Sequence, residues 1–324
     1  MAVTTAGVVR RDLPGDSDDD APCDDATVVT LGRSGAIPPC QPEAAPAASR
    51  LRTIALTVAT LVCFAANSLL CRAALRPRLV DAATFTSIRL VSGAAALALI
   101  VILRGRARPG GGSFGAGLAL FLYAAAFSLA YVRIGAGVGA LLLFGAVQVT
   151  MLGWTVARGA RPGAVQWVGI AVALGGLAYL GLPGASAPDP IGALLMITAG
   201  VAWGAYSLRG RSARDPIATN ADNFLRALPF TIALSVALLR DRVATGEGIL
   251  LAAASGALAS AGGYSLWYAV VPILGATRSA AVQLTVPVLA GIGATALLGE
   301  HLTARIAISG AAILAGIALT LRRR

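Results

Sequence analysis

The sequence predicts an all-α membrane protein with ten transmembrane helices in a five-plus-five inverted repeat. The first reason is composition: 57% of the 324 residues are hydrophobic, 13% are charged and the mean hydropathy is +0.77, which is too apolar for a water-soluble chain. The second is length, because apolar stretches of roughly twenty residues recur from Arg50 onwards, and ~20 helical residues cross a hydrocarbon core of about 30 Å. The third is that short patterns of the first half return in order in the second half.

The N-terminal segment, residues 1–49, does not share this apolar character. Acidic residues outnumber basic ones there, Pro and Ala fill much of the rest, and no apolar stretch precedes Arg50. Such a segment buries too little apolar surface to fold. We therefore expect a disordered acidic cytoplasmic tail and not a signal peptide.

The first five helices are predicted between short segments of Arg, Gly and Pro. Thr53–Cys71 and Ile134–Ala157 carry no charge at all, and Arg72, Arg104, Arg133 and Arg158 mark helix ends. The predicted ranges are Thr53–Leu75, Ala82–Leu103, Phe114–Val132, Ala136–Val156 and Gly163–Leu182.

The second five helices are likewise predicted between short segments of Arg, Gly and Pro. Pro190–Leu208 and Ser279–Gly299 are free of charge, and Pro287 is expected to kink the ninth helix. Glu300 precedes the last helix and is expected to cap its N-terminus. The predicted ranges are Ile191–Leu208, Asn220–Leu239, Gly248–Val271, Ala276–Leu298 and Thr303–Leu321.

The distribution of Arg predicts the orientation in the membrane. Ten spans place both termini on one side, and the loops of that side carry the larger share of the Arg residues, from Arg50 and Arg52 to Arg322–Arg324. Positively charged loops stay in the cytoplasm. The sequence therefore predicts a multi-pass plasma membrane protein with both termini in the cytoplasm. We assign the net charge of +11 to these topology signals and expect no nucleic acid partner.

The two halves match at a separation of about 137–141 residues. Asn67-Ser68-Leu69 corresponds to Tyr206-Ser207-Leu208, Arg89 to Arg226, and the segment 127–131 (Phe-Ser-Leu-Ala-Tyr) to 264–268 (Tyr-Ser-Leu-Trp-Tyr). Five helices per repeat, an odd number, force the second copy to be inverted in the membrane. An inverted repeat allows two nearly equivalent packings, one open to each side, with a site between the halves.

Polar side chains within the spans are the candidate substrate-binding residues, because lipid offers no hydrogen-bond partner. Three are amides and three are aromatic: Asn67, Gln148, Gln283, Trp203, Tyr206 and Tyr264. Helix-helix hydrogen bonding explains the amides equally well, and location at the membrane interface is the alternative for the aromatics.

Arg89 and Arg226 are the ionisable residues that lie clearly within the spans. One hypothesis places them as gates or anion contacts at the two rims of a cavity. The alternative is a structural role, with each Arg reaching its interface or binding backbone carbonyls. Asp222, one turn before Arg226, favours the structural role there.

The remaining chemistry-bearing residues indicate no catalytic or metal site. Cys23, Cys40, Cys63 and Cys71 have no metal or disulfide spacing, so we expect no metal and no cofactor. The fifth and tenth helices are rich in Gly, including Gly175, Gly310 and Gly316, and suit a scaffold or a homodimer interface.

The chain resembles the drug/metabolite transporter superfamily, specifically its EamA-type members. The resemblance covers residues 50–322 and rests on Phe64-Ala-Ala-Asn67-Ser68, Ile88-Arg89-Leu90, Gly135–Ala140, Thr285-Val-Pro287 and Gly299-Glu300. It divides the chain into the tail 1–49 and two EamA-like five-helix repeats, 50–184 and 185–324. The first half departs from the pattern, because Met151 or a neighbour stands where many members have Pro, and Gly159-Ala160 where many have Gly-Glu.

The resemblance implies a secondary transporter that moves a small organic metabolite or drug by alternating access. A passive channel is the alternative, although no ring of like charge and no carbonyl filter is visible. A membrane-embedded enzyme on a lipid-linked substrate is a further alternative that the sequence disfavours, since the chain has no Lys, one His and no acidic cluster within its spans.

Overall fold

A computed structural model describes residues 47–105, 110–159, 163–181, 187–238, 242–283 and 285–320. The predicted tail and the predicted helix ends at Leu182, Leu239 and Leu321 lie outside these residues. The described part consists of helices and the turns between them, with one isolated β-bridge between Val80 and Ala244.

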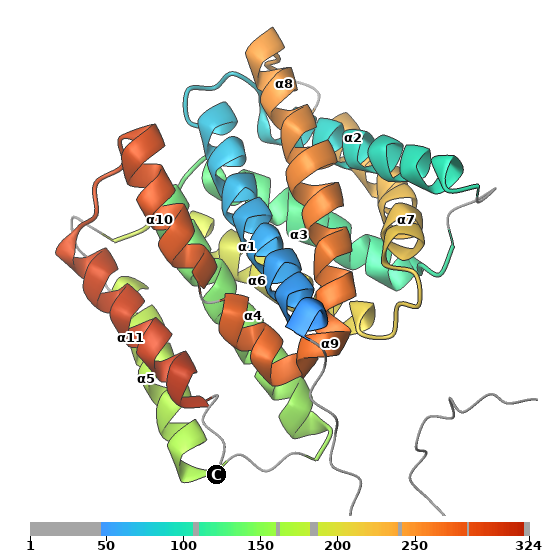
Figure 1. Cartoon of the computed structure of the whole chain (residues 1–324). Helices are drawn as coiled ribbons and strands as arrows, with labels where there is room; N and C mark the ends of the chain where they lie inside the picture. Colours follow the sequence, from blue (N-terminus) through green and yellow to red (C-terminus); the bar gives the residue numbers. More distant parts are fainter. Residues whose placement is uncertain are drawn as a thin grey trace, which may run out of the picture. The chain divides into compact units, whose positions relative to one another are not determined.

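The helices follow the predicted ranges closely (Figure 1). The first half contains α1 (Ala47–Leu75), α2 (Ala82–Leu103), α3 (Phe114–Tyr131), α4 (Ala136–Ala157) and α5 (Ala164–Gly181). The second contains α6 (Pro190–Gly210), α7 (Pro216–Ala237), α8 (Gly246–Ala254), the π-helix η2 (Ser255–Gly262), α9 (Gly263–Gln283), α10 (Thr285–Leu298) and α11 (Ala304–Thr320). The ten predicted spans are confirmed, with α8, η2 and α9 up to Gly275 forming the eighth.

One detail of the second half differs from the expectation. The eighth span contains a π-helix, which the sequence pattern did not reveal. The chain turns at Gly275 (φ 71°, ψ 169°), between the eighth and ninth spans, and the kink expected at Pro287 stays a prediction.

Short polar side chains begin several helices. Asp81, Asp189 and Asp215 accept hydrogen bonds from the first free backbone N–H groups of α2, α6 and α7. Ser113 and Thr245 do the same for α3 and α8. These caps satisfy backbone donors that lipid could not satisfy.

The outer surface of the helices is apolar, as a bilayer requires. Leu194, Leu250 and Leu258 are 66%, 70% and 70% exposed. In the part of the chain that the structure describes, six of the helices are long and apolar enough by themselves to cross a membrane: Arg50–Leu75, Ala82–Leu103, Phe114–Tyr131, Ala136–Ala157, Pro190–Gly210 and Gly246–Gly275. The multi-pass membrane fold is confirmed.

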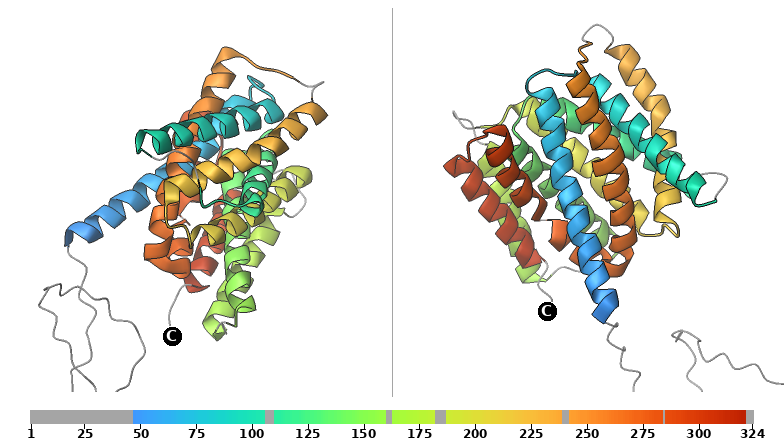
Figure 2. Two further views of the ribbon diagram at one scale, coloured as in Figure 1. Left: turned by 90° about the vertical axis from the view of Figure 1, so that its right-hand side faces the viewer. Right: turned by 45° about the horizontal axis from the view of Figure 1, so that its top comes forward.

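The contacts between helices follow the two-fold repeat: the main contacts of the first-half spans have counterparts made by the equivalent second-half spans. The α1 helix packs on the α8–η2–α9 span and on α10, as α6 packs on α3 and α4. The equivalent pairs α2 with α7 and α5 with α11 pack on each other, as Figures 1 and 2 show. This pattern maps onto itself when first-half spans are exchanged for second-half spans, as a two-fold repeat requires.

For the description of the site we divide these helices into two groups, and α2 and α7 pack on each other across the boundary. We call α1, α2, α8–η2–α9 and α10 the first group, and α3, α4, α6 and α7 the second group. Each group combines spans from both repeats. The polar side chains of the candidate site lie where the two groups meet.

Candidate functional site

Arg89 lies at the centre of the site. It projects from α2 and has no exposed surface. Its Nε donates to the Ser260 hydroxyl at 2.9 Å, and its Nη2 donates to the hydroxyls of Tyr264 at 2.5 Å and Tyr123 at 3.1 Å. The Phe127 ring lies 5.0 Å from the guanidinium carbon. The expected position of Arg89 at the rim of a cavity is therefore corrected. The rotation of α2 about its axis directs this side chain into the interior of the protein.

Asn67 joins α1 to the same cluster. Its Nδ2 donates to the Tyr123 hydroxyl at 3.1 Å, and its Oδ1 accepts from Ser255 at 2.7 Å and from Ser260 at 3.4 Å. Ser255 and Ser260 both belong to the π-helix η2. The wider π-helical turn brings both hydroxyls to one amide, and π-helices occur often at functional sites.

The π-helix approaches α2 at Gly256. A Cβ atom at this position would lie 2.1 Å from the Arg89 carbonyl oxygen and 2.1 Å from the Ser92 hydroxyl. Only Gly permits such an approach, which brings Ser260 within reach of the Arg89 guanidinium.

Aromatic rings enclose the polar cluster. The Trp203 ring centroid lies 4.6 Å from that of Tyr264, 5.0 Å from that of Tyr123 and 5.3 Å from that of Phe64. Trp203 Nε1 donates to Gln283 Oε1 at 3.2 Å. All of these side chains are buried. Tyr123 and Trp203 come from the second group, whereas Phe64, Tyr264 and Gln283 come from the first.

A neutral hydrogen-bond network continues towards the end of α6. The Tyr206 hydroxyl donates to Asn220 Oδ1 at 2.5 Å, and the Tyr268 hydroxyl donates to the Tyr206 carbonyl at 3.1 Å. Gly210 lies against the Tyr268 ring. The two groups are thus joined at this end by uncharged contacts.

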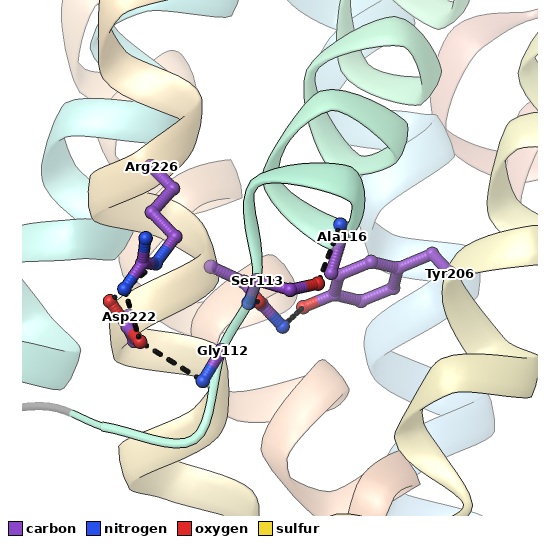
Figure 3. Close-up of polar contacts among 7 residues, drawn as sticks. Gly112, Ser113, Ala116, Tyr206, Asp222 and Arg226 are labelled. Carbon is purple, nitrogen blue, oxygen red and sulfur yellow. Dashed lines mark hydrogen bonds and ion pairs between the residues drawn. The ribbon is translucent and has the colours of Figure 1, made fainter.

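Arg226 occupies a different environment from its repeat partner Arg89. Its Nε lies 2.9 Å from Asp222 Oδ1, one helical turn away, and its side chain is 32% exposed. Asp222 also accepts from the Gly112 backbone N–H at 3.0 Å, while Ser113 is bound through Asn223 to Tyr206 (Figure 3). The predicted Asp222–Arg226 pair is confirmed, and it ties α7 to the start of α3.

An ion pair within the first group lies at the opposite end, where α1 ends, and each of its residues also binds the second group. Arg72 Nε lies 3.0 Å from Glu300 Oε1, and Arg72 Nη1 donates to the Tyr131 carbonyl at 2.7 Å. Glu300 Oε2 accepts from the Ala136 backbone N–H at 2.8 Å, the first residue of α4. The expectation that Glu300 caps the last helix is wrong, since the Thr303 hydroxyl accepts from Ile306 N–H in α11.

The structure brings together five of the six predicted binding residues: Asn67, Trp203, Tyr206, Tyr264 and Gln283. Gln148 instead lines a cavity of about 360 Å³ between α4 and α5, whose other walls are mainly apolar. Whether these residues bind substrate stays a prediction.

Sequence reasoning missed Tyr123, Ser255, Ser260 and Asn220 as members of the site. The spacing of Tyr123, Phe127 and Tyr131 at every fourth residue marks one face of α3 and was the available signal. No sequence pattern marked Ser255, Ser260 or Asn220 as members of the site. Within the described residues, no group of three His, Cys, Asp or Glu side chains could hold a metal ion.

Comparison with known proteins agrees with this architecture. Residues 190–322 match the EamA-like transporter family. The chain is 52% identical over 274 residues to an uncharacterized protein of Pseudomonas aeruginosa, a match that covers 84% of this chain and 96% of that protein. The chain belongs to the EamA-like transporter family. EamA-like proteins are membrane transporters of small molecules, and so is this chain.

A solved structure supports the EamA-like fold. One protein of known crystal structure superposes with a TM-score of 0.60 at 20% identity, covering 82% of this chain and 98% of its own. At this identity the likeness concerns the fold alone.

Proposed function

We propose that this EamA-like protein is a secondary transporter that carries a small organic solute across the plasma membrane by alternating access. Both termini face the cytoplasm in this proposal, and the two repeats are residues 50–184 and 185–324. The substrate binds between the two helix groups, against Asn67, Trp203, Tyr206, Tyr264 and Gln283, with Arg89 among them.

One observation carries the proposal: the buried polar cluster lies at the meeting of two symmetry-related groups, and separate polar contacts join these groups at each end. Tyr123 of the second group binds Asn67, Arg89 and Tyr264 of the first. At one end, Arg72 and Glu300 of the first group bind the Tyr131 carbonyl and the Ala136 backbone N–H of the second, and at the other end the Tyr268 hydroxyl binds the Tyr206 carbonyl. Alternating access requires contacts of this kind, because each end opens only when its own contacts break.

Native Cys71 provides a reporter of opening. It is a free thiol with no exposed surface, one residue before Arg72 on α1. In a protein whose Cys23, Cys40 and Cys63 are replaced by Ala, a membrane-impermeant thiol reagent added outside reaches Cys71 only when the Glu300 end opens.

We predict that Glu300→Gln increases the labelling rate of Cys71 by roughly tenfold. The substitution removes a charge-assisted hydrogen bond worth about 1.5 kcal/mol, and 1.4 kcal/mol is a factor of ten in a population. Thr295→Val, on the same helix end but outside the ion pair, is the control. Equal labelling of Cys71 in both variants would contradict the gating role of the Arg72–Glu300 pair.

Flux in proteoliposomes separates the function classes. A carrier shows counterflow, in which unlabelled solute on one side drives uptake of labelled solute from the other. A channel conducts without counterflow, and an enzyme consumes its substrate. Linear flux with no counterflow would reject alternating access.

A further inference from the structure

The buried guanidinium of Arg89 has no carboxylate partner in the part of the chain that the structure describes. The described acidic side chains lie elsewhere: Asp81, Asp189 and Asp215 cap helices, Asp222 binds Arg226, Glu300 binds Arg72, and Glu247 stands in the first turn of α8. The groups that contact the Arg89 guanidinium are neutral hydroxyls and aromatic rings. A buried cation without a counter-ion is costly and therefore rare.

The cluster also contains more hydrogen-bond donors than acceptors. Arg89 Nη1 is buried and has no hydrogen-bond partner. The Tyr123 and Tyr264 hydroxyls bond to each other at 3.1 Å, and both already accept from Arg89. Whichever hydroxyl donates to the other, the hydrogen of the second has no acceptor among the described residues. Guanidinium and phenol donors thus remain for an acceptor that is not among the described residues.

In the second repeat, the equivalent arginine, Arg226, has a carboxylate partner, Asp222. Arg226 follows Arg89 by 226 − 89 = 137 residues, and the same offset relates its partner Asp222 to position 222 − 137 = 85. Position 85 is Phe85, which is fully buried. The first repeat therefore keeps the arginine and has an apolar ring where the second has the carboxylate.

We infer that Arg89 binds the carboxylate of an organic anion, which is the substrate of the transporter proposed above. One carboxylate oxygen accepts from Nη1 and the other from the free phenol hydrogen of the Tyr123–Tyr264 pair. Trp203, Tyr264 and Phe64 surround the organic part of the substrate. One free guanidinium nitrogen beside one phenol matches two oxygens and one negative charge, whereas a phosphate dianion requires more positive charge.

Binding is tested on the purified full-length protein in detergent, by thermal unfolding, with probes that share a carbon skeleton. Phenylacetate is compared with phenylacetamide and 2-phenylethylamine, and butyrate and indole-3-acetate extend the carboxylate set. The carboxylates should raise the unfolding temperature more than the neutral and cationic probes. An absence of this preference across all three carboxylates would overturn the inference.

Arg89→Gln should weaken carboxylate binding by roughly tenfold to a hundredfold, since a hydrogen bond to a charged group is lost. Arg226→Gln is the matched control and should keep the binding. Arg89→Lys retains the cation and should restore a part of it. Equal weakening by Arg89→Gln and Arg226→Gln would show that the carboxylate binds elsewhere.

A second readout needs no ligand. An unpaired buried charge costs stability, so Arg89→Gln should leave the unfolding temperature of the ligand-free protein unchanged or raise it. Arg226→Gln breaks an ion pair and should lower it. A fall for Arg89→Gln as large as that for Arg226→Gln would make Arg89 a structural residue and overturn the inference.

The inference rests on the proposed transport function, yet the two fail in different ways. Carboxylate binding in detergent does not require transport, so binding without counterflow would reject alternating access and keep the anion site. Counterflow of neutral or cationic solutes without any carboxylate preference would keep alternating access and reject the anion site.

Discussion

At the scale of single residues, polarity in an apolar chain was a good guide to the site. Asn67, Trp203, Tyr264 and Gln283 stand out in their spans because lipid satisfies no polar group, and the structure brings them together. Ser255 and Ser260 could not be predicted, since a hydroxyl in a helix often bonds to its own backbone. The direction of the Arg89 side chain also could not be predicted from the sequence, because it depends on the rotation of α2 about its axis and on its packing.

Gln283 and Gln148 are repeat-related in sequence but differ in surroundings, which leads to a prediction. Gln283 accepts from Trp203 Nε1 at 3.2 Å, and Gln283→Leu leaves this buried indole donor without its acceptor. A buried donor without a partner costs about 1–3 kcal/mol, so the Trp203 ring should reorient. Transport per folded molecule should fall for Gln283→Leu by roughly tenfold, on the same free-energy scale.

Gln148→Leu should have a smaller effect, because Gln148 lines the separate cavity between α4 and α5. The measurement is initial exchange rate in proteoliposomes, normalised to protein that elutes as a folded species. A larger loss for Gln148→Leu would move the substrate site towards α4 and α5.

At the scale of elements, the length of the apolar stretches and the Arg, Gly and Pro residues between them were enough to locate the spans, because each span must cross the same bilayer. Local geometry was less predictable. The π-helix η2 depends on a long-range contact, the approach of Gly256 to α2. Glu300 was expected to act on its own helix, yet its partners are Arg72 and Ala136, which are distant in sequence. No local pattern contains such pairings.

The packing of α5 on α11 gives a second prediction. A Cβ atom at Gly316 would lie 2.4 Å from the Ala173 nitrogen and 2.5 Å from the Gly169 oxygen, both backbone atoms of α5. Gly316→Ala must therefore separate the two helices, and overpacking costs about 1–3 kcal/mol. The unfolding temperature in detergent should fall by several degrees.

Gly310→Ala is the matched control on the same helix. A Cβ atom there would meet only the Leu141 side chain at 3.5 Å, an ordinary contact distance. The unfolding temperature should stay within about one degree of the wild-type value, since Ala also favours the helix. Similar values for both variants would show that α5 and α11 do not pack as described.

At the scale of the whole molecule, the repeat predicted the arrangement better than any single motif. Matches of a few residues are weak in a chain rich in Ala, Leu and Gly, but their common order implied equivalent halves, and the contacts between spans follow that symmetry. The positions of residues 1–46 lie outside the described part. The orientation of the bundle in the membrane remains a prediction from the Arg distribution.

That orientation is tested by labelling in intact cells. In a variant without native cysteines, a cysteine at Asp189, before α6, should react with a membrane-impermeant thiol reagent, whereas one at Arg323 should react only after permeabilisation. The positive-inside rule places the two positions on opposite sides. Reaction of Arg323→Cys in intact cells, with Asp189→Cys protected, would reverse the topology.

Among the described residues, the ion pair of Arg72 and Glu300 has no repeat-related equivalent, and the sequence has Gly159-Ala160 where the second repeat has Gly299-Glu300. In the proposed cycle, the two end states of a symmetric fold are therefore unequal in free energy. A bond of about 1.5 kcal/mol favours one state roughly tenfold. Solute arriving at the Glu300 end meets mostly closed molecules, and its apparent affinity falls by the fraction that is open. A single carboxylate thus gives the proposed two-way carrier different apparent affinities for solute at its two faces.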